Sequence, residues 1–223
     1  MSIIAQRIRQ LHEEIPSGVS LVAVSKFHPA DAIREAYNAG QRLFGESRVK
    51  EFVEKVEALP GDIKWHFIGH LQTNKVRKII GKTALIESVD TEHLLKCIDT
   101  ESEKAGVVTM VLMQVHVARE ETKFGFTADE LYQFFREHRY EQLKATHICG
   151  IMGMASNTDD EQRVRSDFEK IAEIYRTIRD DESLGLHGFD TLSMGMSGDW
   201  PIAVETGSNL IRIGTYIFGN RQY

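Results

Sequence analysis

A lysine that ends a buried strand is the first residue of this sequence whose type and position could support chemistry. The run Val19–Lys26 is apolar and rich in β-branched residues until it stops at Lys26, which is typical of a strand buried on both faces. The amine of such a lysine either reaches solvent at the rim or is held in a dry pocket, where its deprotonated form can condense with a carbonyl compound to give an imine. The run by itself leaves both interpretations open.

A glycine-rich strand end around Ser197 has the composition of an anion site. Residues 193–199 read SMGMSGD, and a hydroxyl group, two glycines and the backbone N–H groups at a helix start can together bind an anion. Asp199 would repel that anion if its carboxylate pointed inward, unless it caps the helix and faces outward. Tight turns use the same glycines, so the segment alone does not decide between a turn and a site.

The segment Arg212-Ile213-Gly214-Thr215 ends the next predicted strand and adds to this site. Gly214 lets the backbone approach a ligand closely, and Thr215 supplies a hydroxyl donor. Arg212 lies in an apolar strand, where an unpaired guanidinium is costly, so it forms either a structural salt bridge or hydrogen bonds to a ligand. Ser197, Gly214 and Thr215 are therefore the best phosphate-binding candidates in the chain.

Predicted strands and helices alternate along the whole chain and must position these residues. Apolar, β-branched runs predict strands at 19–26, 42–47, 64–69, 84–89, 107–117, 146–154, 191–197 and 210–218. Helical spacing of apolar residues predicts helices at about 3–15, 30–40, 48–58, 72–80, 91–104, 127–138, 158–179 and 200–206. The helix at 3–15 precedes the first strand and is therefore additional to the repeat.

Alternation at this spacing implies parallel strands joined by right-handed crossovers. Eight such units in 223 residues predict a (β/α)8 TIM-type barrel, and the even composition predicts a single domain over residues 1–223. The rival is a doubly wound open sheet, which would carry G-x-G-x-x-G after its first strand, where this chain has Ser25-Lys26-Phe27-His28. In a barrel the carboxyl ends of the strands form the functional rim, and Lys26, Ser197 and Arg212 all belong to it.

Composition excludes several classes of function. The formal net charge is -6, from 27 basic and 33 acidic residues, which argues against general nucleic-acid binding. Cys97 and Cys149 are far apart, which suits a reducing cytosol and rules out a cysteine-built zinc site. His66 and His70 straddle a strand end, so we expect packing or hydrogen-bonding roles and no metal site. No signal-peptide core or apolar run of about 20 residues is present, which predicts a cytoplasmic protein with no membrane span.

An amine on one strand, a phosphate site across the barrel and an arginine beside it together fit pyridoxal 5'-phosphate. In this arrangement the aldehyde meets Lys26 as a Schiff base, the phosphate meets Ser197, Gly214 and Thr215, and the ring nitrogen meets Arg212.

Short motifs along the whole chain also resemble one family. They are Val24–Lys26, Phe44–Glu46, Trp65–Lys75, Lys123–Gly125, Gly150–Met152, Met194–Asp199, Ile211–Gly214 and Phe218–Gly219. In this order they resemble the pyridoxal phosphate homeostasis proteins, which look like the barrel half of the bacterial alanine racemases standing alone. The run WHFIGHLQ is the most specific of these motifs.

The resemblance implies a fold-type-III barrel that carries pyridoxal phosphate on the residue matching Lys26. It also implies a cytosolic role in cofactor supply and in amino- and keto-acid balance, without an established catalytic turnover. Ser47 stands where the family usually has asparagine, so a polar contact near the cofactor would be shorter or bridged by water. Met152 and Met194 end neighbouring strands and complete the expected cofactor contacts, although methionines more often only fill gaps in a core.

Three functions remain open at this point. An arginine at the ring nitrogen disfavours protonation there, and racemisation would need acid–base groups on both faces of the substrate carbon. Racemases take the second base from an extra β domain and a partner subunit, and this chain ends at Tyr223. We therefore expect a monomeric cofactor carrier or buffer, with PLP-dependent apo-enzymes as candidate recipients. The alternatives are a PLP-dependent racemase or lyase of low activity, and a phosphosugar-type barrel enzyme whose substrate forms the imine.

Overall fold

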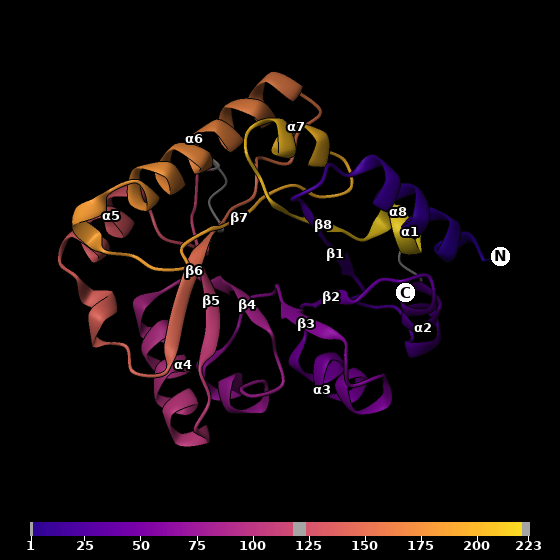
Figure 1. Ribbon diagram of the computed structural model, residues 1–223, viewed down its shortest axis with the longest axis horizontal. Helices are drawn as coiled ribbons and strands as arrows, with labels where there is room; N and C mark the ends of the chain where they lie inside the picture. The colour runs from indigo at the N-terminus through magenta and orange to yellow at the C-terminus, as the bar shows by residue number, and fades with distance from the viewer. Residues whose placement is uncertain (1, 118–123, 220–223) are drawn as a thin grey trace.

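A closed barrel of eight parallel strands forms the centre of the computed structural model, which describes residues 2–117 and 124–219. Each strand pairs with the next along the chain, and β8 closes the ring by pairing with β1 (Figure 1). The strands are β1 (Ser20–Val24), β2 (Leu43–Glu46), β3 (Lys64–Phe67), β4 (Leu85–Val89), β5 (Thr109–Gln114), β6 (Thr146–Met152), β7 (Thr191–Ser193) and β8 (Leu210–Ile213). The predicted TIM-type barrel is confirmed.

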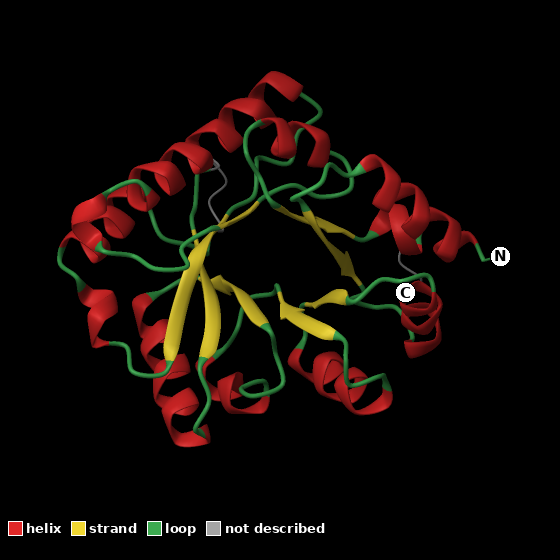
Figure 2. Cartoon of the chain, in the orientation of Figure 1, coloured by secondary structure: helices red, strands yellow, loops and turns green. Residues whose placement is uncertain are grey.

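Helices surround the barrel on its outer side (Figure 2). They are α1 (Ile3–Glu14), α2 (Ala30–Asn38), α3 (Val49–Ala58), α4 (Glu92–Ala105), α5 (Ala128–Arg136), α6 (Glu161–Arg179), α7 (Trp200–Glu205) and α8 (Thr215–Phe218), with 3-10 turns η1 (Thr73–Lys78), η2 (Arg139–Gln142) and η3 (Glu182–Leu184). The additional N-terminal helix α1 packs against α2 and α8. Thr127 caps α5 and forms a reciprocal capping box with Glu130.

Three predicted elements differ from the structure. The segment expected as a helix at 72–80 is the 3-10 turn η1, whereas the strands expected at 191–197 and 210–218 end at Ser193 and Ile213. The next residues, Thr215–Phe218, form the one-turn helix α8. A short apolar run fits a buried strand and a buried helix equally well, so periodicity could not separate the two.

Side chains alternate between the inside of the barrel and the layer under the helices. On β1, Val22 packs inside the barrel, whereas Leu21 and Ala23 pack in the outer layer. The interior cluster consists of Val22, Leu85, Leu112, Cys149, Met152 and Leu210. Because successive side chains of a strand point to opposite faces, Val24, the last residue of β1, belongs with Val22 to the inward series, and Lys26 follows two residues later.

No helix of the described residues is both long and apolar enough to cross a membrane.

Candidate functional site at the carboxyl ends of the strands

Lys26 occupies a sharp turn directly after β1. The carbonyl of Ser25 accepts a hydrogen bond from the N–H of His28 at 3.1 Å, so Lys26 and Phe27 are the two central residues of a β-turn. Phe27 has φ +68°, the left-handed value that the third position of a type II turn requires. A residue other than glycine or asparagine in this conformation costs on the order of 1 kcal/mol, so other contacts must hold the turn.

A buried ion pair from β2 and α3 contacts this turn from the outer side of the barrel. Oε1 of Glu46 accepts hydrogen bonds from Ser25 Oγ at 2.6 Å and from Lys55 Nζ at 2.7 Å. Lys55 Nζ also donates to the carbonyl of Ser25 at 2.9 Å. Glu46 Oε2 is buried and has no hydrogen-bond partner among the residues that the structure describes. Burial raises the pKa of Glu46, and the neighbouring Lys55 ammonium only partly offsets that rise.

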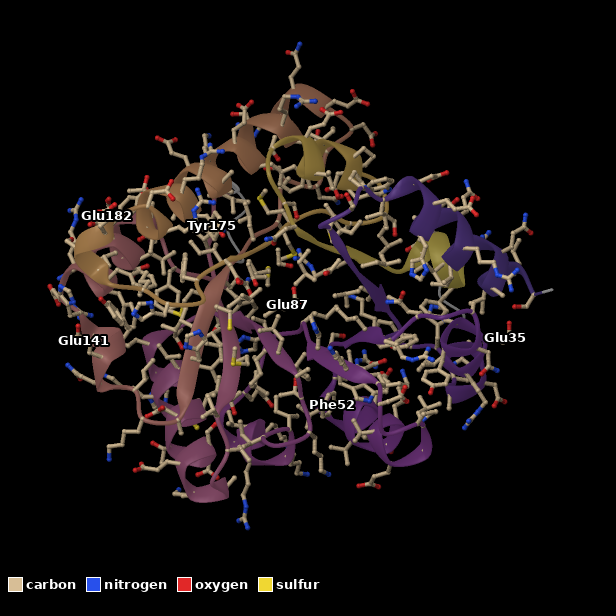
Figure 3. All side chains as sticks on the ribbon, in the orientation of Figure 1. Glu35, Phe52, Glu87, Glu141, Tyr175 and Glu182 are labelled. Carbon is tan, nitrogen blue, oxygen red and sulfur yellow. The ribbon has the colours of Figure 1, made fainter. Side chains whose placement is uncertain are left out.

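A second buried network crosses the interior of the barrel around Arg212 and Glu87. Glu87 Oε2 accepts from Ser193 Oγ at 2.6 Å and lies 3.5 Å from Arg212 Nη1, while Glu87 Oε1 contacts His66 Nδ1 at 2.7 Å. Arg212 also donates to Ser193 Oγ and, through Nη2, to the carbonyl of Gly153 at 3.1 Å. Figure 3 shows Glu87 in the middle of the barrel. The guanidinium is therefore held in one orientation below the rim.

Burial and pairing act in opposite directions on these two charges. Burial by itself raises the pKa of Glu87, but hydrogen bonds from His66 and Ser193 and the charge of Arg212 outweigh it, so the pKa is lowered. Burial lowers the pKa of Arg212, and the negative charges of Glu87 and Asp199 oppose that change. An arginine stays protonated in proteins, so Arg212 can donate hydrogen bonds to a ligand but not a proton.

The predicted phosphate-binding residues come together where β7 and β8 end. Ser197 Oγ accepts hydrogen bonds from the backbone N–H of Gly214 at 3.2 Å and of Tyr216 at 3.4 Å, at the start of α8. A Cβ atom added to Gly214 would lie 3.1 Å from the carbonyl oxygen of Val24, two residues before Lys26. Ser197 Oγ and the N–H groups of Gly214 and Tyr216 are called the cradle below. The cradle lies at the end of β8 and Lys26 follows β1, and these two strands are adjacent.

Asp199 does not cap α7 through its side chain. Its Oδ1 instead accepts a hydrogen bond from the backbone N–H of Met196 at 2.5 Å, which closes the β7–α7 loop on itself. The carboxylate is thus directed to its own loop, and the cradle at Ser197 keeps its backbone donors.

The other three residues predicted to contact the cofactor lie in three different environments. Ser47 follows β2 and is half-buried beside Gly69, whose added Cβ would lie 2.3 Å from the Ser47 carbonyl oxygen. Met152 packs inside the barrel, but Met194 is fully buried in the outer layer. Because Ser193 points inward to Arg212, the next residue must point outward, and the packing of Met194 gives no support to the predicted ring contact.

The two histidines of the WHFIGHLQ run have polar partners. His66 contacts Glu87, and His70 Nδ1 lies 2.6 Å from Asp90 Oδ2 while its ring stacks on Phe124 at 3.9 Å. Within residues 2–117 and 124–219, no three His, Cys, Asp or Glu side chains are grouped as metal ligands would be. Lys123 of the K-F-G motif lies outside the described residues.

A cavity of about 630 Å³ opens at the same rim, on the side of β5, β6 and β7. Its lining includes Gln114, Met196 and Asp199 but neither Lys26 nor Arg212. The cavity therefore adjoins the lysine-and-cradle site without coinciding with it, and the site is defined by its side-chain geometry.

Comparisons with known proteins define the class first. The family model described as "Alanine racemase, N-terminal domain" matches residues 1–222. The alanine racemase of E. faecalis has the same barrel, with a TM-score of 0.73 over 98% of this chain and 58% of that chain, at 19% sequence identity. The fold is thus that of an alanine-racemase-type barrel.

Relatives with higher sequence identity define the particular family within this class. The structure of PipY of Synechococcus elongatus PCC7942, solved with PLP bound, is 36% identical and has a TM-score of 0.88 over 97% of this chain and all of that one. The pyridoxal phosphate homeostasis protein of Aquifex aeolicus is 38% identical over 100% of this chain and 97% of its own length. That of Schizosaccharomyces pombe is 37% identical over 91% of this chain and 84% of its own. The chain belongs to the pyridoxal phosphate homeostasis protein family.

Several residues of the site were not identified from the sequence. Glu46 and Glu87 lie within apolar strands, and Lys55 lies on a helix whose many charges suggest a solvated face. A charged residue inside an apolar strand was the available signal, because such a group must find a buried partner. Nothing in the sequence identifies Lys55 as that partner of Glu46.

Proposed function

We propose that this protein binds pyridoxal 5'-phosphate as a Schiff base on Lys26 and acts as a carrier or buffer in pyridoxal phosphate homeostasis. One observation carries the proposal: a lysine at the end of β1 lies beside a cradle of backbone N–H groups at the end of β8. The relatives named as homeostasis proteins and the PLP-bound structure of PipY support the same ligand.

The residues present fit the phosphate group of this cofactor. In the cradle, a neutral hydroxyl, Ser197 Oγ, receives the N–H bonds of Gly214 and Tyr216 at 3.2 and 3.4 Å, which are long distances. A phosphate oxygen is a stronger acceptor because it carries charge. Ser197 can rotate and donate its own O–H to that oxygen, and Thr215 adds a second hydroxyl at the solvent side.

Arg212 fits the ring nitrogen. Its guanidinium is buried in the inward series of β8 and is oriented by Glu87, Ser193 and the carbonyl of Gly153. It therefore offers a fixed hydrogen-bond donor to an acceptor nitrogen. Met152, at the end of β6, would provide an apolar contact inside the barrel, and Ser47 would provide a polar one at the end of β2.

These residues favour binding over turnover. When bound, pyridoxal phosphate stabilises a carbanion most effectively if its ring nitrogen is protonated. Arg212 keeps its own proton and donates only a hydrogen bond, so the electron sink stays weak. We therefore propose that any racemase or lyase activity is low. An assay of alanine racemisation by the reconstituted protein tests this directly, and turnover at ordinary enzyme rates of about 1 per second or more would contradict it.

Location, assembly and partners form the finer part of the proposal. We propose that the chain folds as one domain over residues 1–223, acts in the cytoplasm as a monomer, and passes its cofactor to PLP-dependent apo-enzymes. Reactivation of an apo-enzyme by the loaded protein, followed with and without a scavenger of free pyridoxal phosphate, separates direct transfer from release into solution. Sedimentation of the free and the loaded protein measures the assembly state.

Reductive trapping tests the central bond. Borohydride converts an imine to a stable secondary amine, so digestion and mass spectrometry of the reduced, loaded protein should find the cofactor on the peptide that contains Lys26. The adduct on a different lysine, or no adduct after reconstitution, would contradict the proposal.

A further inference from the structure

The two peptide groups that flank Lys26 are both held by side chains of one helix, α3. Lys55 Nζ donates to the Ser25 carbonyl, which belongs to the peptide bond before Lys26, at 2.9 Å. Glu51 Oε2 accepts from the Phe27 N–H, which belongs to the peptide bond after Lys26, at 2.8 Å. Glu51 and Lys55 are four residues apart and therefore lie on one face of the helix, with 3.4 Å between Oε2 and Nζ.

We infer that Lys55 and Glu51 are positioning residues that fix the turn carrying Lys26, so that its amine meets the aldehyde of the ligand in one geometry. The inference rests on the proposed function, because it assumes an imine at Lys26. It assigns to α3 a part in ligand chemistry although neither side chain needs to touch the ligand.

Lys55 is buried, and its contacts hold its ammonium in one position. Its side chain is 9% exposed, and its ammonium contacts Glu46 Oε1, the Ser25 carbonyl and Glu51 Oε2. An ammonium has three donors, so these contacts use its full capacity. Glu46 in turn holds the hydroxyl of Ser25 at 2.6 Å, so both the side chain and the carbonyl of Ser25 are fixed.

The strain at Phe27 explains why the turn needs the contacts with Lys55 and Glu51. Its φ of +68° is unfavourable for a residue with a side chain, whereas a glycine would adopt this φ without steric strain. Glu51 binds the Phe27 N–H, and the guanidinium of Arg48, just before α3, lies 4.3 Å from the centre of the Phe27 ring. Without these contacts the turn would relax toward a commoner conformation, and Lys26 would change direction.

The turn is also joined to the phosphate cradle. His28, its last residue, stacks on Phe218 of α8 with 5.0 Å between ring centres. The first turn of α8 supplies the N–H of Tyr216 to the cradle. Contacts from α3 on one side and α8 on the other therefore set the relation between the amine and the phosphate site.

The test compares two ligands that differ only at the reacting group. Pyridoxal 5'-phosphate carries the aldehyde, and pyridoxine 5'-phosphate carries a hydroxymethyl group in its place and cannot form an imine. Affinity for both and the rate of appearance of the imine absorbance are measured for the wild type, Lys55→Met and Lys26→Ala. The matched control is Lys50→Met, on the same helix, whose side chain is 87% exposed and whose ammonium lies 3.9 Å from Glu54 Oε1.

We expect Lys55→Met to form the imine about tenfold or more slowly, since small misplacements of a reacting group cost this much, while its affinity for pyridoxine 5'-phosphate stays within about twofold of wild type. Lys50→Met should match the wild type with both ligands. Equal weakening of both ligands in Lys55→Met would mean a general packing role, and unchanged imine formation would mean no role. Either result overturns the inference.

Removal of Lys55 leaves the Glu46 carboxylate buried without its cation, so thermal melting of each variant must accompany the binding data. If Lys55→Met does not melt cooperatively, Glu51→Ala carries the same comparison, because Glu51 is partly exposed and its loss leaves the Glu46–Lys55 pair intact. A failure of the proposed function itself is distinct from these outcomes: the wild type and Lys26→Ala would then give the same result with the aldehyde.

Discussion

Glu87 and Arg212 face each other inside the barrel from β4 and β8, which are four strands apart in a closed ring of eight. Oε2 and Nη1 are 3.5 Å apart, and the hydroxyl of Ser193 bridges them. Both side chains are at most 5% exposed. A buried pair of this kind contributes little net stability, but loss of one partner is costly, so its value lies in holding the guanidinium at a fixed place under the rim.

Arg212→Met should destabilise the protein strongly, by about 3–5 kcal/mol, because the buried Glu87 carboxylate loses its cation. The double variant Glu87→Gln/Arg212→Met should recover part of this loss, since it removes both charges. Urea unfolding of the wild type, the two single variants and the double variant measures the coupling. Additive effects of the two substitutions would show that the charges do not interact.

Glu87 should also make stability depend on pH in the acid range. Its pKa is lowered in the folded protein, so below the carboxyl group's ordinary value of 4.5 the unfolded chain binds a proton that the folded protein does not. The stability that Glu87 contributes is therefore complete above this value and declines as the pH falls toward the lowered pKa, by up to about 1.4 kcal/mol per pH unit.

The difference in free energy of unfolding between the wild type and Glu87→Gln, measured from pH 6 to pH 3, isolates this contribution. It should shrink as the pH falls below 4.5. Glu46, whose pKa is raised, affects the free energy of unfolding in the opposite direction. The stability that Glu46 contributes is present at low pH and is lost as the pH rises through the raised pKa. A difference that stays constant over the whole range would contradict the assignment to Glu87.

Gly214→Ala should weaken pyridoxal phosphate binding by about tenfold, which corresponds to about 1.4 kcal/mol. The new methyl group would lie 3.1 Å from the Val24 carbonyl oxygen and 3.2 Å from the Val24 Cβ, so the cradle and β1 must move apart. Gly61→Ala, just before β3 at the amino ends of the strands, is the matched control, because an added Cβ at Gly61 meets no atom of the described residues within 4 Å apart from its chain neighbours. Titration of both variants checks the prediction, and equal affinities would place the phosphate elsewhere.

The sequence predicted the parts of the site that are local and missed those that join distant segments. Lys26, Ser197 and Gly214 follow strand ends, where a lysine, a serine or a glycine interrupts an apolar run, and the alternation of elements was enough to put them on one rim. The Glu46–Lys55 and Glu87–Arg212 pairs join different elements, and a sequence without alignment carries no record of such pairing. The outward direction of Met194 depends on where β7 places Ser193, a register that composition does not give.

The most direct test of the account is the absorbance spectrum of the reconstituted wild type compared with Lys26→Ala. An imine between Lys26 and pyridoxal phosphate absorbs in the near-ultraviolet to visible range, apart from the free aldehyde. We predict that the wild type has this band after excess cofactor is removed and that Lys26→Ala, which keeps Ser197, Gly214 and Arg212, lacks it. An unchanged band in Lys26→Ala, or no band in the wild type, would contradict the central claim.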